Sequence, residues 1–200
     1  HIYLGIGGCY EIGAIDPRYS EKNKKTVSQL IIEQQDYVLR AVPPYSKTVT
    51  IHVNKSPNID TLLAILLIKQ LLAVGKIDNV LRKIVKYVSF CVSGRVTPIV
   101  ANFFTLYMYL YGAKQVTQIS EEDFEKTIKT FEKVINVAHN IISSSKCKID
   151  SVDFLSKLKA EPFLNDITGY LQEDYNKFLK EIREKTHYDR NTNSYITPCE

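Results

Sequence analysis

The sequence predicts an α/β protein: a mostly parallel sheet flanked by helices in the first half, and a helical C-terminal half. Two observations indicate this. The β-branched segment Thr48–Val53 is followed closely by a long apolar segment that starts near Pro57, which is the strand-then-helix order of a βαβ unit. Beyond residue 115 the apolar residues recur at helical spacing. We expect an α/β domain over residues 1–115 and a helical extension over 116–200, either packed on it or continuous with it.

The individual elements follow from hydrophobic spacing and from the residues that end each segment. β-Branched runs predict strands, apolar residues three and four apart predict helices, and glycine or proline interrupts both. In chain order we expect a strand at His1–Gly5, a loop at 11–25, a helix at Thr26–Leu39, a strand at Thr48–Val53, helices at Pro57–Val74, Asn79–Phe90, Pro98–Tyr111, 120–142, Ser151–Leu158 and Pro162–Lys185, and a polar, frayed tail from Thr186.

Ser56 and Pro57 indicate where the most apolar helix begins. Serine is a favoured N-cap and proline is favoured at the first helical position, so we expect these roles for them. The helix is apolar on almost every side, which predicts that it is buried on most sides. Asp60 would then lie in the first turn, where the helix dipole favours a carboxylate even when that carboxylate is merely solvated.

Composition and cysteine spacing exclude several classes of protein. With 44% hydrophobic residues over 200 positions, the chain can bury a full core without cross-links. The four cysteines are far apart and form no C-x-x-C pair, which disfavours a structural zinc site and a disulfide framework. The longest apolar run, Leu62–Ile68, is far shorter than the roughly 18 residues that span a membrane. Because no signal-peptide pattern is visible either, we expect a cytoplasmic protein without membrane contact.

The junction between the strand Thr48–Val53 and the helix after it predicts a ligand site. In open α/β sheets, ligands bind outside the carboxyl ends of the strands, and a helix N-terminus there favours an anion. Adjacent glycines after the first strand indicate a tight turn or a close backbone approach. The expected ligand-binding residues are Gly7, Gly8, Arg18, Asn54, Lys55, Ser56, Asn58 and Asp60.

Several of these segments resemble the motifs of the DHH phosphoesterase superfamily. Val53–Asp60, followed by a buried helix, is similar to the family's motif apolar-His-x-(Asn/Ser)-Pro-Asp-apolar-Asp. Gly5–Gly8, Ile15–Arg18 and Tyr87–Arg95 resemble three further motifs of the family, and together the matches cover about the first 115 residues. The resemblance implies hydrolysis of phosphate esters by a pair of divalent ions, Mn²⁺ or Mg²⁺.

The sequence departs from the family at most metal ligands. Asn54 stands in place of the family's His and Asn58 in place of its first Asp. The two His that follow the family's other Asp fall on Pro17 and Arg18, and a later Asp falls on Val92. Only Asp16 and Asp60 remain as carboxylates, too few for a tight pair of divalent ions.

We therefore expect a degenerate metal site that binds a phosphate-containing ligand or a protein partner. Two alternatives remain open. One is an assembly protein whose helical half docks a partner or a second copy of the chain, and the other is an active metal-dependent phosphoesterase. A ligand-binding protein and an assembly protein differ at the Asn54–Asp60 cleft. A ligand site must be open and polar there, whereas an assembly protein can have this cleft filled.

The remaining histidines and basic runs suggest no further chemistry. His52, in a strand, is expected to be a hydrogen-bonded packing residue rather than a ligand, and His139, in mid-helix, has no partner nearby in the sequence. Nucleic acid remains a less favoured partner, because short basic runs are usually solvated faces. These runs are Lys22, Lys24 and Lys25, and Arg82, Lys83 and Lys86.

Overall fold

The structure, a computed structural model, describes residues 1–6, 12–17, 25–54, 57–93, 120–149 and 151–163, with short stretches between 173 and 196. The expected helix Pro98–Tyr111 lies outside these residues, as do Gly7, Gly8, Arg18, Lys55 and Ser56. The elements are β1 (Ile2–Leu4), β2 (Ala14–Ile15), α1 (Val27–Glu33), α2 (Gln35–Arg40), β3 (Ile51–Val53), α3 (Ile59–Val74), α4 (Asn79–Val92), α6 (Glu121–Ser145), α7 (Val152–Lys159), β4 (His187–Asp189) and β5 (Ser194–Ile196).

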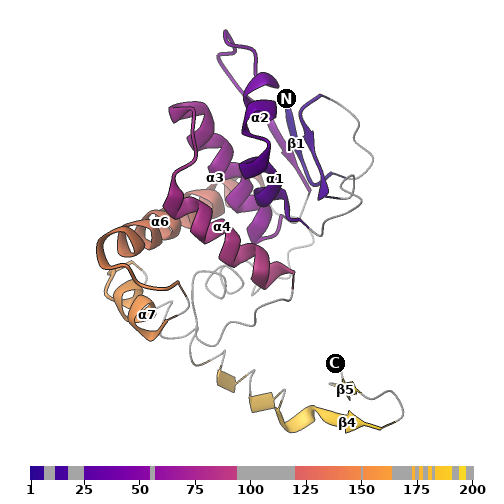
Figure 1. The fold of residues 1–200 in the computed structure, drawn as a ribbon, viewed down its shortest axis with the longest axis vertical. Helices are drawn as coiled ribbons and strands as arrows, with labels where there is room; N and C mark the ends of the chain where they lie inside the picture. Colours follow the sequence, from indigo (N-terminus) through magenta and orange to yellow (C-terminus); the bar gives the residue numbers. More distant parts are fainter. Residues whose placement is uncertain are drawn as a thin grey trace.

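A three-stranded parallel sheet in the order β2-β1-β3 lies against helices, which confirms the predicted α/β class (Figure 1). Tyr3 pairs with Ala14 on one side and with His52 on the other. Ile2 and Leu4 are completely buried, so the core lies on the helix-facing side of β1. Both expected strands therefore belong to one sheet.

Strand β2 lies within the segment that we expected to be a loop, so that prediction was wrong. Gly13 explains why a strand can begin there. It has a φ of +95°, and a Cβ at this position would lie 2.5 Å from the carbonyl oxygen of His1. The backbone of the returning chain thereby comes close enough for Tyr3 to donate a hydrogen bond to the Gly13 carbonyl at 3.1 Å.

The expected helix Thr26–Leu39 consists of two helices, because the backbone leaves the helical conformation at Gln34, with ψ at 34°. Helix α3 is also shorter than expected. Its N-cap is Asn58, whose side chain accepts a hydrogen bond from the backbone nitrogen of Thr61 at 2.9 Å. Pro57 precedes this cap, so the roles predicted for Ser56 and Pro57 were wrong.

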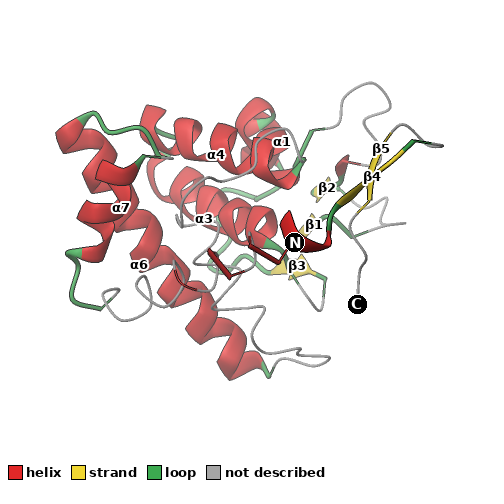
Figure 2. Cartoon of the chain, turned by 90° about the horizontal axis from the view of Figure 1, so that it is seen from below, coloured by secondary structure: helices red, strands yellow, loops and turns green. Residues whose placement is uncertain are grey.

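Helix α3 forms the centre of the core, as its apolar composition predicted. It contacts α1, α2, α4 and α6, and Figure 2 shows it lying between α4 and α6. Eleven of its sixteen residues are buried, among them Asp60 and Thr61. Polar side chains that are buried need hydrogen-bond partners inside the protein.

The C-terminal half is helical as expected, and α6 buries one of its faces. That face includes Phe131, Ile135, Ala138 and Ile142. Pro162 lies in a turn and does not begin a helix. Strands β4 and β5 form an antiparallel hairpin in the segment that we expected to be a frayed tail, which corrects that expectation.

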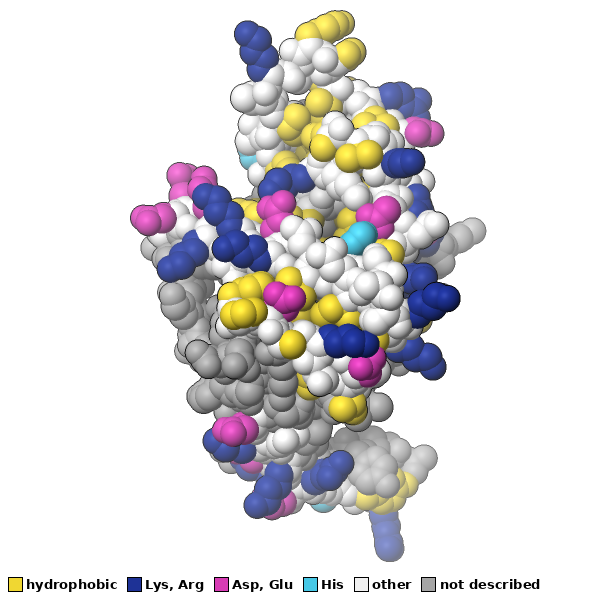
Figure 3. All heavy atoms as spheres, turned by 90° about the vertical axis from the view of Figure 1, so that its left-hand side faces the viewer, with side chains coloured by type: hydrophobic (Ala, Val, Ile, Leu, Met, Phe, Trp, Pro, Cys, Tyr) yellow, Lys and Arg dark blue, Asp and Glu magenta, His cyan; other side chains and the backbone are white. Residues whose placement is uncertain are grey.

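Charged side chains of both signs are intermixed on the side of the molecule where α6 and α7 lie (Figure 3). Across the described atoms of that face, Asp and Glu lie scattered among Lys and Arg, and hydrophobic side chains show between them. Among the helices that the structure describes, none has the length and hydropathy to cross a lipid bilayer.

Candidate functional site

A cleft of about 360 Å³ lies outside the carboxyl ends of the three parallel strands. Gly5 follows β1, Asp16 follows β2 and Asn54 follows β3. Pro17 follows Asp16 after β2 and also lines the cleft. The other described lining residues come from the N-terminal ends of α1 and α3 and from the end of α4; they are Lys25, Thr26, Val27, Asn58, Asp60, Thr61 and Val92. The structure therefore brings together Asp16, Asn54, Asn58 and Asp60, which the sequence had placed at this edge.

Gly5 and Asn54 set the shape of the cleft at the ends of β1 and β3. Gly5 has a φ of +61°, the left-handed region that favours glycine, and it lies beside Val27 at the start of α1. The side-chain amide of Asn54 donates a hydrogen bond to the Gly5 carbonyl at 2.9 Å. Asn54 thus joins two strand ends, a structural role for a residue that we expected to bind ligand.

Asp60, which we expected to bind ligand or metal, points into the protein and is only 3% exposed, so it is not a solvated carboxylate of the first turn either. Its Oδ2 accepts a hydrogen bond from the backbone nitrogen of Val27 at 2.7 Å. Its Oδ1 accepts from the backbone nitrogen of Ser28 at 3.3 Å and from the Ser28 hydroxyl. The carboxylate therefore accepts hydrogen bonds from the first two N–H groups of α1, which have no partner within that helix.

Burial raises the pKa of the Asp60 carboxyl, and the hydrogen bonds from Ser28, Thr26 and the Val27 backbone partly offset this rise.

The N-terminus of α1 is anchored a second time by Thr26. Its hydroxyl lies 2.8 Å from the Ser89 hydroxyl of α4, and its backbone nitrogen donates to Gln29 Oε1 at 3.0 Å. The α1 end of the cleft is thus a closed network of internal hydrogen bonds.

The α3 end of the cleft is more open. Asn58 is exposed, and its Oδ1 accepts hydrogen bonds from the backbone nitrogen of Thr61 and from the Thr61 hydroxyl. Within the described part of the chain no hydrogen bond occupies the Asn58 Nδ2 donor. Lys25 lies at the edge of the cleft, where its ammonium pairs with Glu33 at 2.6 Å and its side chain is 30% exposed.

The described residues do not fit a pair of divalent ions. They contain no group of three or more His, Cys, Asp or Glu side chains that would hold a metal. Asp16 and Asp60 line the same cleft, but the oxygens of Asp60 already accept three hydrogen bonds. A two-metal site needs several anionic ligands that remain available.

Sequence reasoning missed the contribution of Lys25, Thr26 and Thr61 to the cleft. Lys25 had been noted only as part of a basic run, and Thr61 gave no signal beyond its position one residue after Asp60. For Asp60 itself a signal existed: it is the one carboxylate in a helix predicted to be buried on most sides, and a buried carboxylate needs internal partners.

The histidines have structural partners. His52 stacks on Tyr3 with ring centroids 4.6 Å apart, and its Nε2 lies 3.0 Å from Nδ1 of His1. This is consistent with the packing role expected for His52. His139 pairs with Asp78 at 3.2 Å, a residue distant in the sequence that spacing did not reveal.

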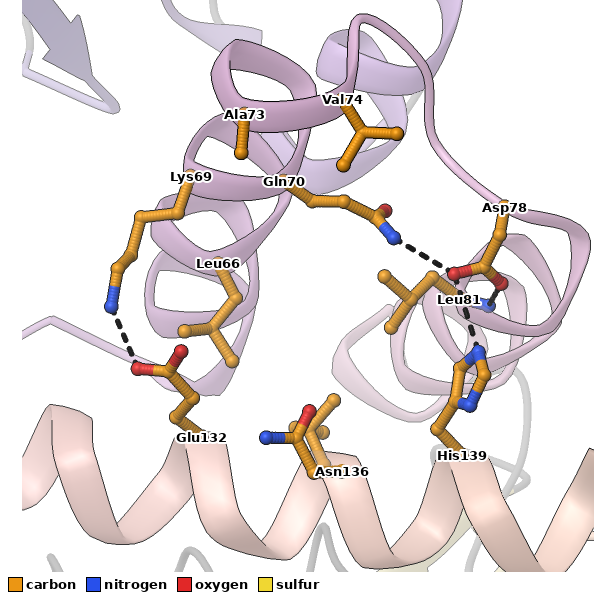
Figure 4. Close-up of a pocket in the computed structure, with 11 residues that line it drawn as sticks. Leu66, Lys69, Gln70, Ala73, Val74, Asp78, Leu81, Glu132, Asn136 and His139 are labelled. Carbon is orange, nitrogen blue, oxygen red and sulfur yellow. Dashed lines mark hydrogen bonds and ion pairs between the residues drawn. The ribbon is translucent and has the colours of Figure 1, made fainter.

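Asp78 and His139 belong to a second hollow, of about 510 Å³, between α3, α4 and α6 (Figure 4). On one side Lys69 of α3 pairs with Glu132 of α6 at 2.7 Å, and on the other side Gln70 donates to Asp78 at 2.9 Å. Partial burial acts to raise the pKa of Asp78. Hydrogen bonds from Gln70 and the backbone, together with the charge of His139, outweigh this effect and lower that pKa.

No protein-family model, curated protein or solved structure matches this chain. Its function must therefore be inferred from the chemistry of its own sites.

Proposed function

We propose that the chain binds a phosphate-containing ligand in the cleft at the strand ends, without metal catalysis, as a degenerate relative of the DHH phosphoesterases. The observation that carries this proposal is the inward orientation of Asp60. Its carboxylate serves the backbone of α1, which leaves Asp16 as the remaining described carboxylate of the resembled metal motifs. The cleft has therefore lost most of the negative charge that a metal pair requires.

The groups at the open end of the cleft suit an anion. The side chain of Asn58 accepts a hydrogen bond from the N–H group of Thr61. The N–H groups of Ile59 and Asp60 belong to the same first turn of this sixteen-residue helix. Such a helix end carries a partial positive charge and unpaired donors. The Asn58 amide, which has no hydrogen-bond partner among the described residues, adds a donor at this end. Lys25 pairs with Glu33 at 2.6 Å, so its ammonium would contact a phosphate only by exchanging that carboxylate for the ligand.

The polar lining also favours ligand binding over the alternative of a scaffold. A protein whose helical half only docks a partner has no need of an open, polar hollow at the sheet edge. Here the cleft has a volume of about 360 Å³ and polar side chains from both flanking helices. A ligand of that size would be a small organic phosphate rather than a polymer.

The experiment is a titration of the ¹⁵N-labelled protein with inorganic phosphate and with a nucleoside monophosphate, followed by NMR. We expect saturable shifts of the Ile59, Asp60 and Thr61 amides and of the Asn58 side chain. Lys25→Gln and Lys55→Glu should each weaken binding several-fold. Lys47→Gln, which changes an exposed lysine away from the cleft, should not.

Two results would contradict the proposal. The absence of any saturable shift would favour the assembly protein. Binding that requires Mn²⁺, with release of phosphate from a monoester, would favour the active phosphoesterase.

A further inference from the structure

A third hollow, of about 670 Å³, lies between α4 and the loop that joins α6 to α7. Lys83 and Tyr87 contribute to it from successive turns of α4, and Ile142 contributes from the last turns of α6. The loop supplies Lys146, Cys147, Lys148 and Ile149. It shares no described lining residue with the strand-end cleft, so it is a separate candidate site.

Three lysines of this hollow are exposed, and none of them has a partner of opposite charge among the described residues. Lys83, Lys146 and Lys148 form no ion pair with any residue that the structure describes. No Asp or Glu stands among the described lining residues. The nearby Lys157 differs, because Asp153 neutralises it at 2.7 Å. Like charges gathered around one hollow repel one another, and a bound anion removes that repulsion.

The carbonyl groups at the C-terminal end of α6 do not neutralise these lysines. Cations commonly gather near the last carbonyl groups of a helix, which are negative and unpaired. Here serine hydroxyls occupy some of these carbonyls. Ser144 donates to the carbonyl of Asn140 at 2.8 Å, and Ser145 donates to that of Ile141 at 2.5 Å. The ammonium groups of Lys146 and Lys148 make no hydrogen bond to them.

The floor of the hollow is apolar. Ile142 and Ile149 are 6% and 9% exposed, and the half-buried ring of Tyr87 lies along the same lining. A volume of this size is typical of pockets for small organic ligands, and apolar surface beside fixed charge suits a ligand that is apolar at one end and anionic at the other.

We infer that this hollow binds a nucleotide-sized organic phosphate. The phosphates lie against Lys83, Lys146 and Lys148, and the flat base lies against Tyr87 and the two isoleucines. Aromatic side chains hold bases of any sequence by stacking, whereas lysines hold phosphates by charge. The site requires no metal ion and goes beyond the function proposed for the strand-end cleft.

Cys147 provides a direct probe of occupancy because it lines the hollow and is half-buried. We would follow its alkylation by N-ethylmaleimide, a neutral reagent, with EDTA present and with peptide mapping by mass spectrometry. A bound ligand slows the reaction by the factor 1 + [L]/Kd, about fivefold when ATP is at about four times its Kd. Inorganic tripolyphosphate, which lacks a base, should protect less at the same concentration.

Matched variants identify the residues responsible. Lys83→Ala with Lys148→Ala should abolish protection, and the exposed pair Lys126→Ala with Lys133→Ala on α6 should leave it intact. Exposed lysines of this kind can be replaced without unfolding a protein. Protection should also persist in Lys25→Gln, which separates this site from the strand-end cleft.

Three results would overturn the inference. They are no protection by millimolar ATP, protection that survives the Lys83 and Lys148 substitutions, and equal protection by tripolyphosphate. The last result would reduce the hollow to a patch that binds any polyanion, including an acidic peptide or a nucleic-acid strand.

Discussion

The carboxylate of Asp60, in the first turn of α3, lies 2.7 Å from the backbone nitrogen of Val27, in the first turn of α1. A side chain of α3 thus caps α1, a helix that is separate from it in the sequence, whereas α3 itself is capped by Asn58. Because the Asp60 side chain is buried, its hydrogen bonds to α1 are shielded from water and each contributes more than a surface bond would.

Replacing Asp60 should destabilise the fold strongly. Asp60→Ala leaves the backbone nitrogens of Val27 and Ser28 without an acceptor inside the protein, which we expect to lower the free energy of unfolding by about 2–4 kcal/mol. Asp60→Asn keeps the shape and one acceptor, so it should cost less than Asp60→Ala. Urea denaturation followed by circular dichroism measures both.

Asp36→Ala is the matched control, because Asp36 is an exposed carboxylate in the first turn of α2. It should cost no more than about 1 kcal/mol. Equal losses for Asp36→Ala and Asp60→Ala would mean that the cap that Asp60 provides to α1 contributes nothing beyond a helix dipole interaction.

The start of α3 can be tested by two substitutions two residues apart. Asn58→Ala removes the oxygen that accepts from Thr61 and should lower the free energy of unfolding by about 1 kcal/mol, whereas Asn58→Asp should retain most of it. Ser56→Ala should change stability little, because Asn58 is the cap. A larger loss of stability for Ser56→Ala than for Asn58→Ala would show that Ser56 is the N-cap, as the sequence alone suggested.

The hydrogen bonds from Gln70 and the backbone, together with the charge of His139, lower the pKa of Asp78 and should make stability depend on pH in the acid range. The pKa of Asp78 is lowered by folding, so its stabilising contribution is present above the unfolded pKa near 3.8 and is lost as pH falls through the folded pKa. Asn is an equally good N-cap, and therefore Asp78→Asn isolates the charge.

Since the side chain of Asp78 is 35% exposed, solvent screens its charge, and we expect Asp78→Asn to cost about 0.5–1 kcal/mol at pH 7, mainly through weaker hydrogen bonds from Gln70 and the backbone. The difference between wild type and variant should shrink below about pH 4. Denaturation curves at several pH values measure this difference. A difference that stays constant down to pH 2 would show that the charge has no part in it.

Millimolar Mn²⁺ or Mg²⁺ should raise the melting temperature little. A metal that binds only the folded state stabilises it by about 2.7 kcal/mol at a hundredfold excess over Kd, which thermal unfolding detects readily. A large rise that Asp16→Asn abolishes would contradict this prediction. Asp16 is the better test here, because replacing Asp60 would destabilise the protein with or without metal.

The strands and helices that the sequence predicted well are those with a strong local signal. Thr48–Val53 is rich in β-branched residues, and α3, α4 and α6 have long apolar faces. Strand β2 lacked such a signal because it has only two residues and depends on Gly13 returning beside His1. The break between α1 and α2 at Gln34 contains neither glycine nor proline, so the helical spacing of apolar residues predicted one continuous helix there.

The candidate site was predictable in position but not in orientation. The strand-to-helix junction placed Asn54, Asn58 and Asp60 at one sheet edge, where the structure has them. What each side chain binds depends on segments distant in the sequence. Asp60 caps α1, Asn54 reaches β1, and His139 meets Asp78, and none of these partners is set by local spacing.

The capping of α1 by a side chain of α3 also links the two helices in their opening motions. Helix α1 has seven residues, too few to persist alone in water, and its first two amides donate to a side chain 33 and 32 residues further along the chain. If the first turn of α3 frays, the amides of Val27 and Ser28 lose their acceptor at the same moment. Their hydrogens should therefore exchange with solvent together with those of the first turn of α3, as one cooperative unit.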